Sequence, residues 1–319
     1  MKENKKVLLG VMKRNVERED KFENLVLNLA VRRLTGARKG ERGVYYSKNG
    51  KKLLMASKTL EGEYVVAEGT EEIDDNAFWG CAFVTKIVLP STVTTIGREA
   101  FGRCISLTEL VIPSSVKKLS ANPFVDLDAG VVRCFADGYT VHGELLYNAE
   151  RTKVVASLSN AAISIVPEGV TAIGELAFSR RRSLVKVALP DGLKTIGGDA
   201  FSDCDALEEV IIPASVTDIE AYAFAECDRL RTVTFLGAVR HVSTTAFSDC
   251  DALRKVVVPQ GATARLRKQL RIADESKLVF DESIESELPR EKASDKKPKG
   301  EKPAKEKPAR DKDKGTKKK

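Results

Sequence analysis

The stretch that decides the fold is Ile96-Gly-Arg-Glu-Ala-Phe-Gly-Arg-Cys-Ile-Ser-Leu-Thr-Glu-Leu-Val-Ile-Pro113, because it recurs every 23 residues. Its two markers are a phenylalanine and, three residues later, a cysteine. A fixed period between 20 and 50 residues is typical of a solenoid, and this one falls in the range of leucine-rich repeats. The sequence therefore predicts seven stacked coils, numbered by their phenylalanines: Phe78, Phe101, Phe124, Phe178, Phe201, Phe224 and Phe247.

Each unit contains the run Leu-x-x-Val-x-Ile, which is rich in β-branched residues and is closed by proline. This pattern predicts a short strand that ends where proline cannot extend a ladder. The other apolar positions face the inside of the coil, and one coil cannot bury them alone, so neighbouring coils must stack. Equivalent residues should then lie about 4.8 Å apart. We expect one parallel sheet of short strands over a continuous core of phenylalanine and cysteine columns.

The pattern Val-x-x-Ile-Gly-x-x-Ala-Phe-x-x-Cys-x-x-Leu-x-x-Val-x-Ile-Pro resembles the BspA-like leucine-rich repeats of bacterial and protozoan proteins. The stretch that begins Gly143-Glu-Leu-Leu-Tyr-Asn148 resembles the hairpin insert that punctuates those arrays. The resemblance covers about residues 43 to 281. It implies a β-rich, α/β-type leucine-rich-repeat solenoid with a binding role, in a family of mostly surface or adhesion proteins, and it carries no catalytic motif.

Two hairpins are expected within the array. Strand-forming residues on both sides of Asn49-Gly50 predict the first hairpin, which lies within residues 44–55. A second copy begins at Gly143, and the same offset of 100 residues maps Phe78 onto Phe178. The array thus contains a larger duplication of a hairpin plus three coils. Coil 3 departs from the pattern with Pro123 and Leu127, which marks a seam between the copies.

These patterns divide the chain into three segments. Residues 1–42 form an N-terminal helical segment, because Phe22, Leu25, Val26 and Leu29 follow a helical period. We expect this helix to cap the open end of the solenoid, with a partner or membrane-surface helix as the alternative. Residues 43–281 form the solenoid, closed by a helix over 262–271 and a strand over 277–280. Residues 282–319 are a Lys-rich tail with few apolar residues, which we expect to be disordered.

The net charge of +7 is localised in this tail. From Arg290 to Lys319 there are 14 basic and 6 acidic residues, and the rest of the chain has 39 basic and 40 acidic ones. The apolar run Val7–Met12 is shorter than a secretory signal requires, and no run reaches the length of a membrane span. We therefore expect a cytoplasmic protein, with the cell surface as the alternative.

Little in the sequence indicates catalysis. The column cysteines, at 81, 104, 204, 227 and 250, lack a metal-ligand spacing, so we expect buried, reduced thiols rather than disulfides. Arg181 takes the cysteine position in coil 4, and the sequence offers no reason for it. His142 and His241 have no nucleophile at a known spacing. We expect no enzyme activity and no cofactor.

Two files of carboxylates flank the cysteine column on the 23-residue step. Asp side chains that bond backbone N–H groups at tight turns would explain these files. Arg180 and Arg182, at the same two positions of coil 4, would compensate the negative charges of the first pair of carboxylates. A divalent cation is the sharper alternative, although no known calcium motif accompanies the files. The weak metal candidates are Asp203, Glu226 and Asp249 in one file and Asp205, Asp228 and Asp251 in the other.

The strand face is the better candidate for recognition, because residues between the buried ones point outward. Either these residues neutralise each other and favour strands, or they form an apolar stripe flanked by charge for a protein or peptide partner. The candidate partner-binding residues are Lys86, Glu109, Lys186, Glu209, Thr232 and Lys255 in one column, and Val88, Val111, Ile211, Thr234 and Val257 in the next.

The sequence therefore predicts a protein- or peptide-binding scaffold. One alternative is an intracellular protein whose basic tail binds nucleic acid or an anionic membrane, with the repeats as a spacer. The interleaved acids and the lack of aromatic residues in the tail count against it. The other alternative is a surface adhesin exported without a classical signal.

Overall fold

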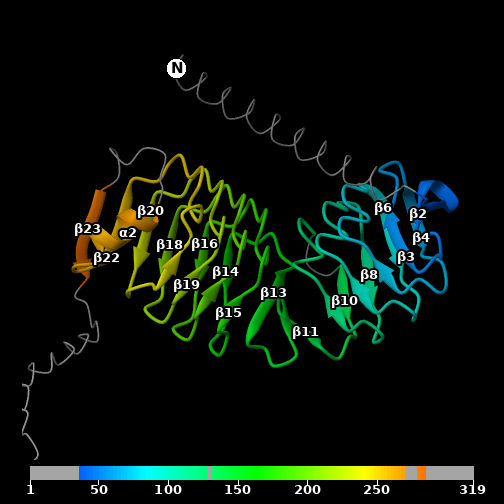
Figure 1. The fold of residues 1–319 in the computed structure, drawn as a ribbon, viewed down its shortest axis with the longest axis horizontal. Helices are drawn as coiled ribbons and strands as arrows, with labels where there is room; N and C mark the ends of the chain where they lie inside the picture. The colour runs from blue at the N-terminus through cyan, green and yellow to red at the C-terminus, as the bar shows by residue number, and fades with distance from the viewer. Residues whose placement is uncertain (1–35, 128–130, 271–278, 285–319) are drawn as a thin grey trace, which may run out of the picture. The chain divides into compact units, whose positions relative to one another are not determined.

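The computed structural model describes residues 36–127, 131–270 and 279–284, which all belong to one compact unit ending at Glu287. Successive coils lie side by side in chain order, and strands are far more abundant than helices (Figure 1). The solenoid predicted from the repeat is therefore confirmed. The predicted N-terminal helix at Phe22–Leu29 lies outside the described residues. The predicted last strand is present but extends to Ile284, so residues 282–284 of the predicted tail belong to it, and the rest of the tail lies outside the described residues.

The Leu-x-x-Val-x-Ile runs form parallel strands, as predicted, but three sheets rather than one. The second hairpin separates the first sheet from the second, and no strand ladder joins β16 to β18. The first sheet comprises β4 (Glu61–Val65), β6 (Phe83–Val88), β8 (Glu109–Ile112) and β10 (Val132–Cys134). The second comprises β14 (Ile163–Ile165) and β16 (Lys186–Ala188); the third comprises β18 (Glu209–Ile212), β20 (Thr232–Phe235), β22 (Lys255–Pro259) and β23 (Val279–Ile284).

A further set of two-residue strands was not anticipated. Each one comes from the end of the Val-x-x-Ile part of the repeat and pairs in parallel with its neighbours. In the first copy these strands are β5 (Glu72–Ile73), β7 (Thr95–Ile96) and β9 (Lys118–Leu119). In the second copy they are β15 (Ala172–Ile173), β17 (Thr195–Ile196), β19 (Asp218–Ile219) and β21 (His241–Val242).

Both predicted hairpins are present, and each begins one of these short-strand ladders. The first consists of β2 (Tyr45–Tyr46) and β3 (Lys52–Met55), preceded by β1 (Arg38–Lys39) and the 3-10 helix η1 (Glu41–Gly43). The second consists of β11 (Tyr139–His142), β12 (Leu145–Asn148) and β13 (Lys153–Ser157). We call residues 36–135, with coils 1–3, the first half, and residues 139–259, with coils 4–7, the second half.

The phenylalanines stack as predicted, with ring centroids 5.6 and 6.2 Å apart in the first half and 4.9 to 5.1 Å apart in the second. The expected continuous core is wrong, however, because the buried residues form two main clusters. The second hairpin divides them. Leu145, Tyr147 and Val154 pack into the second-half core, whereas Leu146 and Val155, on its other face, pack into the first-half core.

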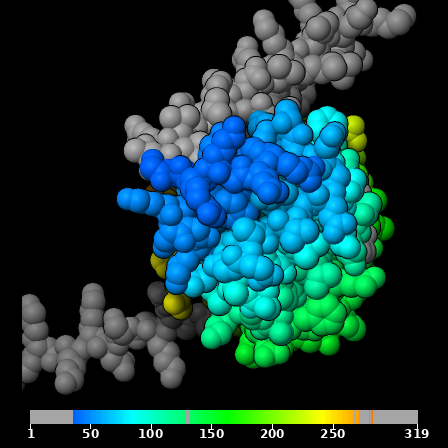
Figure 2. Space-filling model, turned by 90° about the vertical axis from the view of Figure 1, so that its right-hand side faces the viewer, coloured from blue at the N-terminus to red at the C-terminus, as the bar shows by residue number. Residues whose placement is uncertain are grey.

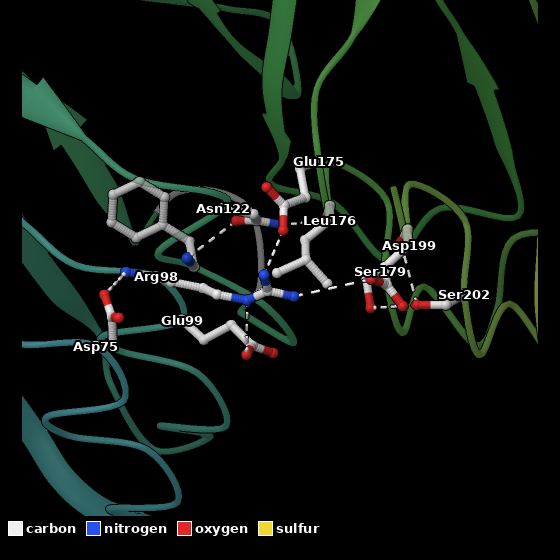
Figure 3. Close-up of polar contacts among 10 residues, drawn as sticks. Asp75, Arg98, Glu99, Asn122, Glu175, Leu176, Ser179, Asp199 and Ser202 are labelled. Atoms are coloured by element: carbon white, nitrogen blue, oxygen red, sulfur yellow. Dashed lines mark hydrogen bonds and ion pairs between the residues drawn. The ribbon is translucent and has the colours of Figure 1, made fainter. Parts of the chain in front are cut away.

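Polar and apolar contacts join the two halves at the seam, and Figure 3 shows the polar ones. Arg98 forms ion pairs with Glu175 and, at 3.8 Å, with Asp199, both in the second half. The Asn122 side-chain amide donates a hydrogen bond of 2.8 Å to the Leu176 carbonyl oxygen. Trp79 packs with Val125 and Leu176 in a third, smaller buried cluster. These contacts connect the coils on both sides of the second hairpin.

Arg181 is 1% exposed and completes the seam. Its Nη1 donates hydrogen bonds to the Leu127 carbonyl oxygen at 2.7 Å and to Asn160 Oδ1 at 3.2 Å, and its Nη2 donates to the Ser157 carbonyl oxygen. The equivalent Cys81 thiol donates to the Ser57 carbonyl oxygen, at 3.5 Å. A long side chain with several donors is needed at this position because coil 4 must also reach coil 3.

The ends of the array are covered by side chains that bond backbone carbonyl groups. At the N-terminal end, which faces the viewer in Figure 2, Arg42 donates to the Glu63 carbonyl oxygen at 2.6 Å and to that of Glu61. At the other end the predicted helix is confirmed as α2 (Thr263–Gln269), and its Arg265 donates to the Arg240 carbonyl oxygen at 2.7 Å. Such contacts occupy edge groups that would otherwise pair with another chain.

Candidate functional site

The candidate residues of the strand face point away from the core. All eleven are exposed or half-buried, and strand pairing places Glu209, Thr232 and Lys255 in one row and Ile211, Thr234 and Val257 in the next. The first-half candidates form equivalent rows on β6 and β8, where Lys86 pairs with Glu109. The interruption between sheets means that these rows are discontinuous along the array.

Charged side chains of the first half neutralise each other. Lys86 Nζ lies 3.5 Å from Glu109 and 4.0 Å from Glu63, and Arg133 lies 4.0 Å from the other oxygen of Glu109. Lys86 and Glu109 are both half-buried. On β6 and β8 the charged column therefore has the arrangement expected from mutual neutralisation between neighbouring strands.

Part of the second half differs, although Lys255 there forms an ion pair of 2.7 Å with Asp281. Lys186, Glu208, Glu209 and Arg231 are exposed, and within the described part of the chain none of these four forms an ion pair. Together with Val185 and Thr232 they line a hollow of about 210 Å³ at the break between β16 and β18. This part of the strand face therefore combines uncompensated charges of both signs with a recess.

Apolar side chains lie beside this hollow. Ile163 and Ile165 on β14 are 59% and 71% exposed, and Ile211 on β18 is 47% exposed. The pairing of Ile165 with Ala188 places β14 beside β16. We did not anticipate Ile163 and Ile165 as surface residues, although the alternation Ile163-Ser-Ile165 before Val166-Pro167 is a strand signal.

The carboxylate files occupy a special backbone position. Asp203, Glu226 and Asp249 have φ of 56°, 59° and 58°, in the left-handed region, which aspartate tolerates better than most residues. The predicted offset by arginines is present, since Arg180 lies 3.9 Å from Asp203 and Arg182 lies 3.6 Å from Asp205. The left-handed backbone is compatible with the aspartates of this file, but Arg103 and Arg180 have the same conformation at this position, so it does not by itself account for the carboxylates.

The cation hypothesis gains no geometric support. Over the described ranges, no group of three or more His, Cys, Asp or Glu side chains is arranged to hold a metal ion. Burial raises the pKa of Asp205 to about 6, with smaller contributions from Asp203 and Asp228, while Arg182 opposes the shift. Metal binding by the six candidate carboxylates stays a prediction.

The column cysteines are buried and free, as expected. They act as donors as well as small apolar groups, because the thiols of coils 2, 5, 6 and 7 donate to a carbonyl oxygen of the preceding coil and the Cys81 thiol donates to that of Ser57. The distances are 3.2 Å from Cys104 to Phe78, 3.2 Å from Cys227 to Phe201 and 3.0 Å from Cys250 to Phe224. Burial raises the pKa of Cys81 to about 12, which keeps this thiol protonated. Cys134 lies outside the column and is half-buried.

The comparisons with solved structures agree with this architecture. A leucine-rich cell surface protein from Faecalibacterium prausnitzii is 21% identical, with a TM-score of 0.51, and the match covers 66% of this chain and 62% of that one. A leucine-rich repeat protein from Eubacterium ventriosum is 23% identical, with a TM-score of 0.52, and the match covers 66% and 67%. The chain therefore spans about two thirds of the length of these proteins, and the likeness establishes the fold.

No curated protein matches the sequence significantly. None of the helices in the described part of the chain is long and apolar enough to cross a membrane. The pattern of the BspA type leucine-rich repeat region matches residues 66–129 and 156–268 in six copies, which is more than half of the chain. The repeat spacing, the stacked coils and this match together establish that the chain belongs to the BspA-type leucine-rich-repeat family.

Proposed function

We propose that this protein is a non-enzymatic scaffold that binds a protein or a peptide through its exposed strand face. The observation that supports the proposal is the group of exposed isoleucines Ile163 and Ile165 on β14 and Ile211 on β18, which lie on either side of β16 next to charges that form no ion pairs with other described residues. Single exposed apolar residues are common, but an apolar patch rimmed by polar groups marks an interaction surface. Solenoids present such extended surfaces to partners.

A random 12-residue peptide library displayed on phage tests the proposal whatever the natural partner is. Peptides selected on the wild-type protein should bind at least about tenfold more weakly to the double variant V111E/I211E, because both substitutions place a carboxylate on the apolar row. Circular dichroism should show an unchanged fold, since neither side chain is buried. Ile105 is 72% exposed and lies outside the strands, so I105E is the matched control.

The proposal fails if the selected peptides bind the double variant as they bind the wild type. It also fails if I105E weakens binding as strongly, because the peptides would then recognise a different surface. A library that yields no peptide discriminating wild type from the double variant counts against it in the same way.

The cytoplasmic location stays a prediction, and the surface alternative has one supporting observation, namely that a protein of similar fold is described as a cell surface protein. Protease treatment of intact cells separates the two locations. A cytoplasmic protein is protected until the cells are lysed, whereas a surface protein is digested at once. The predicted binding of nucleic acid or membrane by the tail concerns residues outside the described part of the chain.

A further inference from the structure

Because of the internal duplication, the two halves of the strand face can be compared residue by residue: equivalent positions differ by 100 in residue number. Lys86 and Glu109 are half-buried, whereas Lys186 and Glu209 are exposed. Val111 is half-buried, whereas Ile211 is 47% exposed. The first-half charges form ion pairs and their second-half equivalents form none with other described residues. At these three positions the second half is more accessible, although the first-half strand face also has exposed apolar side chains at Val65 and Phe83.

Two local changes cause the difference. Ile163 stands where the first half has Glu63, the residue that lies 4.0 Å from Lys86, so Lys186 lacks that neighbour. In addition, β6 and β8 belong to one ladder, whereas β16 and β18 belong to different sheets. Lys186 and Glu209 therefore do not form the ladder pair that Lys86 and Glu109 form, although the Glu208 N–H still donates to the Val185 carbonyl oxygen, at 3.4 Å instead of the 2.8 Å between Thr108 and Thr85. The first strands of the two sheets, β4 and β14, do not account for the difference in exposure, because Val65 and Ile165 at equivalent positions are both exposed.

The charges around the hollow define the kind of ligand that fits. Lys186 and Arg231 supply two positive groups, and Glu208 and Glu209 supply two negative ones. A nucleic acid or an anionic membrane would meet repulsion from the two glutamates. A peptide that carries one acidic and one basic side chain would offer an opposite charge to each pair, and aliphatic side chains would cover Ile163, Ile165 and Ile211.

We propose that the hollow between β16 and β18, with Ile163, Ile165 and Ile211 beside it, binds an extended peptide segment carrying an acidic, a basic and an aliphatic side chain. This proposal rests on the proposed function and assigns it to the second half of the strand face. In an extended segment every second residue faces the same side, so one segment can present these side chains together.

The duplication also supplies matched controls. Peptides selected from the random 12-residue library on full-length protein are measured by isothermal titration calorimetry against single variants. We expect I211E to weaken binding at least about tenfold and V111E to change it less than about twofold. We expect K186E to weaken binding likewise, and K86E to have little effect. Replacing the acidic residue of a selected peptide by lysine should restore its affinity for K186E, because the charges are then complementary again.

Other results overturn this inference in recognisable ways. Peptides that lose affinity for V111E but keep it for I211E would place binding in the first half, and the proposed function would survive. Peptides insensitive to both variants would contradict the proposed function as well. Concentration-dependent dimers in sedimentation analysis that I211E disrupts would show that a second copy of this chain occupies the surface. Binding of a random single-stranded oligonucleotide that I211E weakens would show a nucleic-acid surface instead.

Discussion

Arg181 Nη1 donates a hydrogen bond of 2.7 Å to the Leu127 carbonyl oxygen, and this contact joins coil 4 directly to coil 3 across the second hairpin. In coils 5 and 6, which have a cysteine at this position, the thiol donates to a carbonyl oxygen of the preceding coil. The substitution of arginine for cysteine thus occurs where the array has to connect two separate cores. It adds a buried polar contact between the two halves to those of Arg98 and Asn122.

Replacing Arg181 with methionine tests this connection. Methionine keeps most of the apolar length but leaves the buried carbonyl oxygens of Leu127 and Ser157 without these donors. We expect the free energy of unfolding to fall by about 2–4 kcal/mol, as for other buried polar groups that lose their partners. Urea denaturation followed by circular dichroism measures the loss. R182M is the control, since Arg182 is 42% exposed and its ion pair contributes less than about 1 kcal/mol. Equal losses for the two variants would contradict a special role for Arg181.

The variant L176A tests whether the small apolar cluster of Trp79, Val125 and Leu176 stabilises the seam between the two halves. Trp79 is the only tryptophan of the chain and is 4% exposed in contact with this cluster, so its fluorescence reports on the seam alone. We expect L176A to cost about 2–3 kcal/mol and to shift the native emission of Trp79 to longer wavelength, because water reaches the ring. Leu207, buried in the second-half core, supplies the control. L207A should destabilise the protein without shifting the emission, and a shift in both variants would mean that the seam is not a separate unit.

The repeat predicts the coils, the long strands and the hairpins because each of these depends on residues close in sequence. Stacking of Phe201 on Phe224, at 5.0 Å, follows directly from the 23-residue step. The short strands are harder to anticipate, since two residues such as Thr95–Ile96 carry no alternation that distinguishes a strand from a turn.

The remaining features depend on contacts between segments far apart in the sequence. Both faces of the second hairpin are buried because coils from two halves meet there; the consecutive apolar residues Leu145–Tyr147 and Val154–Ala156 are typical of strands buried on both faces, but they do not identify the partner on each side. The same holds for Arg181, whose partner Leu127 lies 54 residues away. At the candidate site, the outward rows follow from strand alternation, whereas the hollow results from a break in pairing between β16 and β18 that the nearly identical repeats do not show.

Asp205 should make stability depend on pH. Burial raises its pKa to about 6 from an ordinary value of 3.8, so the folded protein binds a proton more tightly than the unfolded chain. The carboxylate therefore lowers stability above pH 6, and this penalty disappears as the pH falls from about 6 to about 4. We expect D205N to be more stable than wild type at pH 7 by up to about 1 kcal/mol, a value reduced for screening because the side chain is 36% exposed. Wild type and D205N should melt at the same temperature at pH 4. A difference in melting temperature that is the same at pH 4 and pH 7 would show that titration of Asp205 is not its cause.

Asp249 tests whether the first carboxylate file is set by backbone geometry or by a cation. Its φ of 58° favours glycine, and Gly80 occupies the equivalent position in coil 1 with a φ of 72°. We expect D249G to keep or raise the free energy of unfolding, by up to about 1 kcal/mol, because glycine has no steric penalty in the left-handed region. Asp251, two residues later, does not have a positive φ, so D251G should lower stability by the usual entropic cost. Thermal denaturation with and without calcium decides the matter: if calcium raises the melting temperature of wild type but not of D249G, the file binds a cation and the geometric explanation is incomplete.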